Sequence, residues 1–365
     1  MTSPSSADSG RLLSLDALRG FDMFWIVGGD YLFRSLPNIH NNALTRMLAA
    51  QMEHCDWAGF HFYDLIFPLF VFIVGVAIPL SLPRLLENSG RMAASKRICL
   101  RSLLLFLLGV FYMGGVANGF KNIYFAGVLH RIAVAYFFTA LLFCFCRPRA
   151  LMTLCAALLI GYWALMTCVQ VPGLGPPDLS APGRNLAHHL DQLYLPGQKF
   201  EGTLLSTMAA VANCLLGVFA GQFLKRADLP PLRKYYGLMA GGVICVALGL
   251  EWADYFPVIK LLWTSSYVLI ACGLGAILLA TFYYLIEIRG WRRWAQPFVW
   301  IGMNAITIYL VTGLVNFHRL AGRLVGGDVA RCLGSYADFV RTLVAIALAL
   351  WLVRFLHQRR IFLRL

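Results

Sequence analysis

The stretch that decides the fold is "HCDWAGFHFYDLIFPLFVFIVG", residues 54–75. Its first eleven residues carry two histidines and two aspartates, whereas no charged residue follows Asp64 before Arg84. An α-helix needs about 20 predominantly apolar residues to cross the hydrocarbon core of a bilayer. The stretch therefore predicts a transmembrane helix with titratable groups at one end.

The composition of the chain extends this prediction to its whole length. Hydrophobic residues make up 59% of the 365 residues and charged residues 13%, whereas a soluble domain carries about 25% charged residues. Lipid offers the backbone no hydrogen-bond partner, and Leu-, Ala- and Phe-rich runs without strict alternation favour helices over a barrel. We expect one all-α polytopic domain over 1–365, with a polar tail at 1–11 and about ten transmembrane helices. The expected spans are 13–33, 60–82, 98–116, 126–146, 149–171, 202–224, 235–253, 263–286, 296–317 and 336–357.

Basic residues predict the orientation of these spans. Lys and Arg gather in alternate connections, and such connections face the cytoplasm in membrane proteins. The two longest connections of the other set, about 34–59 and 172–201, hold fewer of them. We therefore expect both termini on the cytoplasmic side of an inner membrane, and we assign the net charge of +14 to topology and anionic lipid rather than to nucleic acid. The basic residues concerned are Arg84, Arg91, Lys96, Arg97, Arg147, Arg149, Lys225, Arg226, Arg233, Lys234, Arg289, Arg292, Arg293, Arg354, Arg359, Arg360 and Arg364.

Polar residues recur near the outer ends of several expected spans, and Asn304 lies roughly at mid-depth of the ninth. Ionisable groups in membrane spans are costly and usually face a protein interior or a water-filled cavity. We therefore expect these helices to share a cavity that opens outward, over which the loop 172–201 either folds as a lid or acts as a spacer. The residues are Asp30, His54, Asp56, Asp64, His130, Arg131, Lys260, Trp263, Thr264, Ser265, Ser266, Asn304 and Tyr309.

Most of these residues also have a purely structural interpretation. His54 would be a solvated histidine, Asp64 a helix anchor and Arg131 a cation that reaches the interface. Asn304 would hydrogen-bond between helices. The three-residue spacing of Asp16, Arg19 and Asp22 predicts that they form one stripe on a helix face. The stripe would either form an internal ion-pair ladder or bind the phosphates of a cofactor.

The ten cysteines lie mostly within expected spans, where they act as small apolar residues. Cys55 and Cys332 both fall on the expected outer side, so a disulfide between them is one option. No Cys/His spacing is typical of a zinc site, and the sequence predicts no metal.

Five motifs resemble a known family. They are "RLLSLDALRGFDMFW", "HCDWAGFHFYDLIFPLFVFIVGVAIPLS", "GVLHRIAVAYF", "KLLWTSSYVL" and "IGMNAITIYLV". Together they resemble the heparan-α-glucosaminide N-acetyltransferase family of transmembrane acyltransferases, and most of all its short bacterial members, some of them labelled a domain of unknown function (DUF5009) or NagX-type. The resemblance runs in order from about residue 11 to 317.

The resemblance implies an activity and a partner set. The family moves acetyl from cytosolic acetyl-CoA to the amino group of a glucosamine on the far side of the membrane, and the resemblance also suggests a homodimer. Its catalytic histidine falls on His54, its motif aspartate on Asp64, and an asparagine of its first span on Asp30. His130 and Ala58 also depart from the family pattern, where glutamine and asparagine are common, so the acceptor sugar stays open.

The residue types suit this chemistry. An imidazole near neutrality would act as a general base for the amine or as a nucleophile toward the thioester, and the sequence leaves both routes open. We expect the acceptor and the acyl group to meet Trp57, His130, Arg131, Lys260, Trp263, Thr264, Ser265 and Asn304. The cations expected to bind coenzyme A phosphates are Arg19, Arg97 and Arg101.

The main rival is a permease for amino sugars or N-acetylglucosamine, since many helices with polar groups inside them also suit a transporter. Transporters often show paired, interrupted helices in repeated halves. The sequence shows no clear pair, which favours the enzyme.

Overall fold

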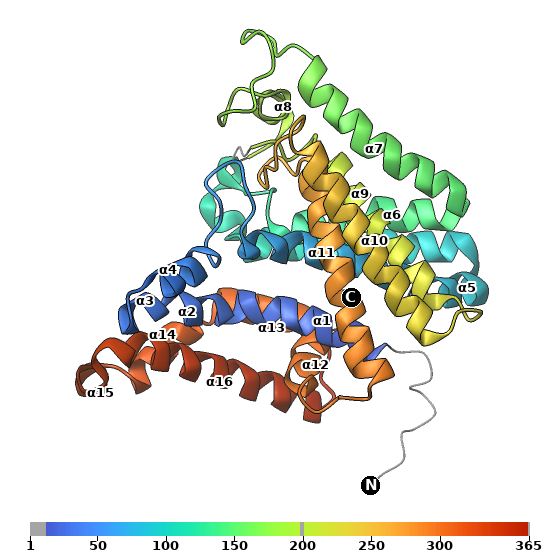
Figure 1. The fold of residues 1–365 in the computed structure, drawn as a ribbon. Helices are drawn as coiled ribbons and strands as arrows, with labels where there is room; N and C mark the ends of the chain where they lie inside the picture. The colour runs from blue at the N-terminus through green and yellow to red at the C-terminus, as the bar shows by residue number, and fades with distance from the viewer. Residues whose placement is uncertain (1–11, 198–200, 364–365) are drawn as a thin grey trace.

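The computed structural model describes residues 12–197 and 201–363 (Figure 1). Within these ranges the chain is helical, with two isolated β-bridges and no strand. The expected all-α fold is confirmed. The expected tail 1–11, residues 198–200 of the long loop and Arg364 lie outside the described residues.

The helices alternate between long apolar segments and short turns. The first half of the chain contains α1 Leu13–Phe24, η1 Trp25–Gly29, α2 Asp30–Arg34, α3 Leu36–Ile39, α4 Ala43–Ala50, η2 Phe62–Leu65, α5 Ile66–Tyr112, η3 Gly115–Asn118, η4 Phe120–Asn122, α6 Val128–Phe145 and α7 Pro148–Cys168. The second half contains α8 Leu186–Tyr194, α9 Thr207–Lys225, α10 Pro231–Trp252, α11 Ser265–Tyr283, η5 Tyr284–Ile288, α12 Gln296–Met303, α13 Ala305–Leu314, α14 Phe317–Leu324, α15 Gly327–Leu333, η6 Gly334–Tyr336 and α16 Ala337–Gln358.

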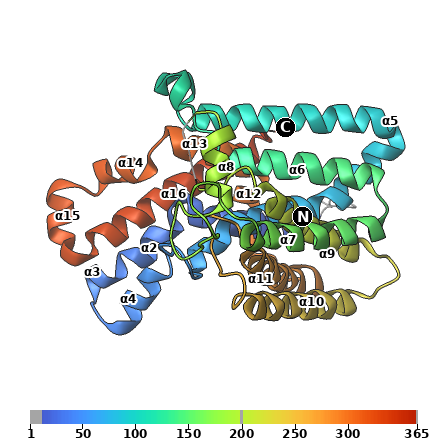
Figure 2. The same ribbon diagram turned by 90° about the horizontal axis from the view of Figure 1, so that it is seen from above.

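Seven helical segments of the described chain are long and apolar enough to cross a membrane, or eight if the bent pair α12–α13 is one span. This confirms a polytopic membrane protein. Two expected spans, 60–82 and 98–116, lie largely in α5, which breaks at Gly90 with φ 74° and ψ 172°. Since 47 helical residues would extend about 70 Å against a hydrocarbon core of about 30 Å, this break separates two arms. Figure 2 shows the second arm beside α6. The number of crossings and their orientation stay predictions.

Two expected spans are interrupted. The first, 13–33, contains the π-helical turn η1, in which Gly28 has a φ of 135° that glycine adopts at no steric cost. The ninth, 296–317, bends by 78° at Asn304. The hydrophobic pattern of the sequence is continuous across both positions and did not predict either break.

The helices form two packed groups. The larger core unites α5, α6, α7, α9, α10 and α11 with one face of α1, and the smaller unites η1, α12, α13, α14 and α16. Glycines allow close approach: a Cβ on Gly75 of α5 would overlap the backbone of Cys214 on α9, and one on Gly20 of α1 would overlap Phe298 on α12. These contacts hold α5 close against α9 and α1 close against α12.

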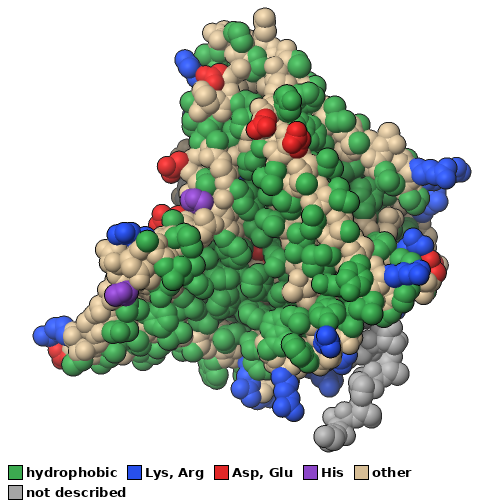
Figure 3. Space-filling view, in the orientation of Figure 1, with side chains coloured by type: hydrophobic (Ala, Val, Ile, Leu, Met, Phe, Trp, Pro, Cys, Tyr) green, Lys and Arg blue, Asp and Glu red, His purple; other side chains and the backbone are tan. Residues whose placement is uncertain are grey.

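Figure 3 shows where charge gathers on one face of the molecule. Lys and Arg side chains lie mainly along the lower and right-hand margins, and a broad hydrophobic surface covers the helices between those margins and the upper loops. This distribution suits the predicted orientation, in which the basic connections share one side of the membrane.

Candidate functional site

A buried carboxylate holds a half-exposed imidazole where α5 begins. His54 lies in the loop after α4, and Asp64 lies in η2, directly before α5. The Nδ1 atom of His54 is 2.9 Å from Oδ1 of Asp64. The His54 side chain is 52% exposed whereas the Asp64 side chain is 0% exposed. The ring is therefore accessible while its partner is fixed inside the protein.

The Asp64 carboxylate is anchored by the backbone. Its Oδ2 accepts the backbone N–H groups of His61 at 3.0 Å and Cys55 at 3.3 Å. The Tyr267 hydroxyl on α11 donates to the backbone carbonyl of Asp64 at 2.7 Å. Asp64 thus anchors the helix start, as its structural interpretation predicted, and at the same time orients the His54 ring.

Lys260 completes the cluster from the loop between α10 and α11. Its Nζ lies 3.3 Å from Asp64 Oδ1 and 2.7 and 3.0 Å from Nδ1 and Nε2 of His54. The backbone N–H of Gly59 donates to the carbonyl of Val258 at 2.8 Å, which joins the two loops. Burial lowers the pKa of Lys260, and the charge of Asp64 opposes that shift.

The contact with Asp64 favours one tautomer of His54. If Nδ1 carries the proton, it donates to Asp64, and Nε2 keeps the lone pair of the ring. The Lys260 ammonium approaches both ring nitrogens, at 2.7 Å from Nδ1 and 3.0 Å from Nε2, and so does not select between the tautomers. The opposite tautomer would leave two acceptors, Nδ1 and the carboxylate, facing each other. With the proton on Nδ1, Nε2 is the proton-accepting nitrogen of the ring.

Trp57 and Asp30 also lie at this site. The Trp57 indole N–H donates to the carbonyl of Leu179 at 2.7 Å, so the long loop 172–197 rests on the motif, as a lid would. Asp30 is buried, lies 3.7 Å from Arg34 and interacts electrostatically with His54.

The residues that follow Lys260 hold its loop in place. Thr264 accepts the backbone N–H of Ile259 at 3.1 Å, and the Ser265 hydroxyl donates to the carbonyl of Leu159 at 2.7 Å. Both side chains are fully buried, so in this structure their hydroxyls serve the backbone. Trp263 has a φ of 54°, a strained value for a residue with a side chain.

Arg131 packs against this loop. Its guanidinium lies 4.5 Å from the centre of the Trp263 ring, and its Nη1 donates to the Ser206 hydroxyl at 2.8 Å. Arg131 is 9% exposed, so its guanidinium lies inside the protein. It supports the Lys260 loop from beneath.

His130 and Asn304 lie apart from the cluster. The His130 ring packs edge-on to Phe106 of α5 at 4.6 Å, and neither ring nitrogen has a hydrogen-bond partner within the described part of the chain. Asn304 lies at the bend between α12 and α13, where its amide donates to the carbonyl of Trp300 at 3.3 Å.

A cavity of about 270 Å³ lies between the two helix groups. Two of the three predicted phosphate-binding cations line it, whereas Arg97 is exposed. Arg101 lies 4.8 Å above the Tyr136 ring, and its Nε has no hydrogen-bond partner among the residues described. The lining residues are Arg19, Phe70, Val74, Ala77, Ile78, Ser81, Arg101, Leu105, Leu129, Ile132, Tyr136, Gly302, Met303, Ala305, Ile306 and Leu363.

The cavity extends along the first arm of α5 toward the cluster. Phe70 and Ser81 both line it, which corresponds to about 16 Å of helix. Phe70 itself lies six residues beyond Asp64, or about 9 Å along the chain axis. The lining of the cavity thus ends about 9 Å short of Asp64, and neither His54, Asp64 nor Lys260 lines it.

The expected ion-pair ladder on α1 forms in part. Arg19 pairs with Asp16 at 3.2 Å. Asp22 is fully buried, and neither carboxylate oxygen has a partner in the described ranges. Arg19 thus faces the cavity while it is tied to Asp16, which suits both interpretations of the stripe.

This fold and cluster define a class: an all-α polytopic membrane protein with a histidine–aspartate–lysine cluster at one end of its bundle. Residues 11–146 match the family model described as "Domain of unknown function (DUF5009)". Human heparan-alpha-glucosaminide N-acetyltransferase (Homo sapiens) is 27% identical, covering 84% of this chain and 53% of the human protein. The mouse protein of the same name (Mus musculus) is 25% identical, covering 98% of this chain and 61% of its own length.

The chain spans between half and two thirds of the length of these curated relatives. The matches agree with the five motifs, and they support the assignment of the chain to the heparan-alpha-glucosaminide N-acetyltransferase family.

Proposed function

We propose that the protein is a transmembrane N-acetyltransferase of a bacterial inner membrane. It would take acetyl from acetyl-CoA on the cytoplasmic side and transfer it to the amino group of a glucosamine-type sugar on the periplasmic side. The observation that carries this proposal is the contact between the exposed His54 ring and the buried Asp64 carboxylate, 2.9 Å apart. The names of the human and mouse relatives support the reaction class.

His54 performs the central step in this proposal. A sugar ammonium must lose a proton before its nitrogen can attack a thioester, and Nε2 of His54 has the lone pair to accept that proton. The same nitrogen would attack the thioester in a two-step route through an acetyl-histidine. Asp64 serves both routes, since it fixes the ring and stabilises the imidazolium that forms.

Lys260 supplies positive charge beside the reacting nitrogen. Its ammonium lies 3.0 Å from Nε2 of His54, close to where the carbonyl oxygen of the acyl group would develop negative charge. One such donor is typically worth about 3–4 kcal/mol of transition-state stabilisation. The same charge disfavours a protonated amine at the site and so favours the nucleophilic, neutral form.

The cavity suits the acyl donor. The thioester of acetyl-CoA supplies an activated acetyl group, and the phosphates of coenzyme A require cations. Arg19 and Arg101 line the cavity, and the Nε of Arg101 lacks a partner in the described structure. Arg97, one helical turn before Arg101, would meet phosphates outside the cavity mouth.

One feature favours the permease as a second candidate. η1 is broken at Gly28, α12 and α13 meet at Asn304, and η1 contacts α13. Interrupted helices that lie together are typical of transporter binding sites. The enzyme accounts better for the His54 cluster, which lies at the end of the bundle.

Sealed vesicles distinguish the two functions. Vesicles that contain the protein are loaded with acetyl-CoA labelled in the acetyl group and exposed to external glucosamine. We expect labelled N-acetylglucosamine outside the vesicles, with none from His54→Ala and normal amounts from the control His40→Ala, which changes an exposed histidine on another loop. Transfer by His54→Ala would refute the catalytic role, and sugar uptake without acetyl-CoA would favour the permease.

A further inference from the structure

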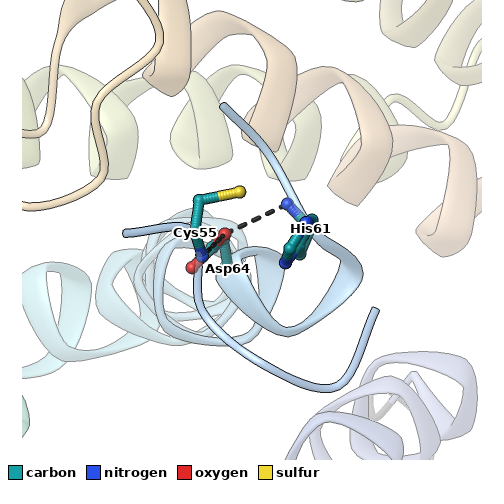
Figure 4. A group of neighbouring side chains, drawn as sticks. All are labelled: Cys55, His61 and Asp64. Carbon is teal, nitrogen blue, oxygen red and sulfur yellow. Dashed lines mark hydrogen bonds between the residues drawn. The ribbon is translucent and has the colours of Figure 1, made fainter. Parts of the chain in front are cut away.

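We propose that Cys55, His61 and Asp64 form a binding site for a transition-metal ion of the zinc type, and that an ion bound there inhibits transfer. The inhibitory part rests on the proposed function, whereas the metal site itself does not. Figure 4 shows the three side chains gathered where the motif loop meets η2.

The geometry permits coordination. The Cys55 sulfur, a ring nitrogen of His61 and a carboxylate oxygen of Asp64 all lie within 4.8 Å of one another. Tetrahedral zinc with ordinary bond lengths would place such atoms about 3.4–3.6 Å apart. Cys55 and His61 are partly exposed loop residues, so small side-chain rotations would close the difference and an ion would have access.

The donor set selects the kind of ion. A thiolate and an imidazole favour zinc and its neighbours over calcium or magnesium, which prefer oxygen ligands alone. Three protein ligands leave a fourth position open for water. Binding would release the thiol proton of Cys55 to the solvent, because the metal coordinates the thiolate.

His61 is already oriented as a metal ligand. Its Nδ1 lies 3.0 Å from the backbone carbonyl of Glu53, and an N–H donated there fixes the ring and leaves Nε2 free. Histidines that bind metals almost always donate their second ring nitrogen in this way. This contact is independent of the three-atom cluster and points to the same use.

A metal ion bound at this site would compete with His54 and Lys260 for the Asp64 carboxylate. Oδ1 of Asp64 serves His54 at 2.9 Å and Lys260 at 3.3 Å. A divalent ion on this carboxylate would repel the Lys260 ammonium and withdraw negative charge from the His54 ring. Metal binding and acetyl transfer therefore exclude each other. Sequence spacing does not indicate this site, because Cys-x₅-His-x₂-Asp is not a zinc pattern.

Cobalt absorption tests the site without any activity assay. The purified full chain in lipid nanodiscs is titrated with Co²⁺, whose bond to a thiolate gives a charge-transfer band in the near ultraviolet. We expect a band that stoichiometric Zn²⁺ removes, and at least about tenfold weaker cobalt binding in Cys55→Ser and His61→Asn. The control Cys332→Ser, which changes an exposed cysteine on α15, should bind as the unaltered chain does. Equal cobalt affinity in Cys55→Ser and the unaltered chain would overturn the proposal, and thermal unfolding verifies that the variants are folded.

Inhibition is measured separately in the vesicle assay. The rate of Cys55→Ser with a chelator present serves as its own baseline, and its inhibitory concentration of Zn²⁺ should be at least about tenfold higher than that of the unaltered chain. Cobalt binding at Cys55 without zinc inhibition would refute the inhibitory part. If no variant transfers acetyl under any condition, the proposed function fails, and the cobalt titration still decides the metal site.

Discussion

Asp64→Asn tests the tautomer of His54 directly, because Asp64 is the partner of its Nδ1. The amide retains the shape of the carboxylate and one acceptor oxygen, which would stay with the backbone N–H groups of Cys55 and His61. The amide nitrogen then faces Nδ1 of His54. Since both would be donors in the present tautomer, the ring must move its proton to Nε2, and the basic nitrogen is lost.

The magnitude follows from these contacts. In serine proteases, exchanging the aspartate that orients the catalytic histidine for asparagine imposes the wrong tautomer and lowers kcat by about 10⁴-fold. We expect a loss of about 10³–10⁴-fold in the transfer rate here, on the same grounds. Lys260 also loses its counter-charge, and breaking one side of a buried pair costs about 3 kcal/mol of folding stability.

The assay compares acetyl transfer and unfolding in the same preparations. Transfer by Asp64→Asn is measured in vesicles at saturating acetyl-CoA, and the midpoint of thermal unfolding is measured alongside. Asp56→Asn is the matched control, because Asp56 is an exposed aspartate of the same loop. A folded Asp64→Asn protein that keeps more than about a tenth of the normal rate would show that the tautomer argument is wrong.

Three further predictions test the rest of the site. Burial lowers the pKa of Lys260 from its usual 10.5, so transfer should fall as the pH rises through that lowered value and the ammonium is lost. Lys260→Arg, which stays charged, should move this alkaline limb upward by at least about one pH unit in the rate profile. Arg101→Gln should raise KM for acetyl-CoA about tenfold and leave KM for the sugar unchanged. Arg97 lies outside the cavity, so Arg97→Gln should raise KM for acetyl-CoA less. Equal effects of the two substitutions would contradict the assignment of the cavity to acetyl-CoA. Trp57→Phe removes the bond to Leu179, worth about 1 kcal/mol, and should speed hydrogen exchange across residues 172–197; unchanged exchange would exclude a lid held by this bond.

The sequence predicts the helices well and their breaks poorly. Apolar runs must be helical in lipid whatever their neighbours are, so the all-α class follows directly from composition. The break at Gly90 falls in the polar connection predicted between the spans 60–82 and 98–116. The turn at Gly28 and the bend at Asn304 lie inside apolar runs, where glycines more often serve close helix contacts, as Gly75 does.

The candidate site, like the fold, could be predicted from the sequence only in part. The family motif pointed to His54 and Asp64, which lie ten residues apart and meet across one short turn. Lys260 is 206 residues from His54, and periodicity and spacing do not specify contacts over that distance. Thr264 and Ser265 were predicted to meet substrate because they are polar. In this structure Thr264 accepts from the backbone of its own loop, and Ser265 donates to the carbonyl of Leu159 in α7.

The bond from Tyr267 to the backbone of Asp64 has a consequence for biogenesis. A ribosome delivers the motif loop to the membrane some two hundred residues before it delivers α11, so an early insertion intermediate holds His54 and Asp64 without Lys260 and Tyr267. Reactivity toward thioesters would then emerge only when the late helices dock, and nascent or truncated chains would leave the cell's acetyl donor intact.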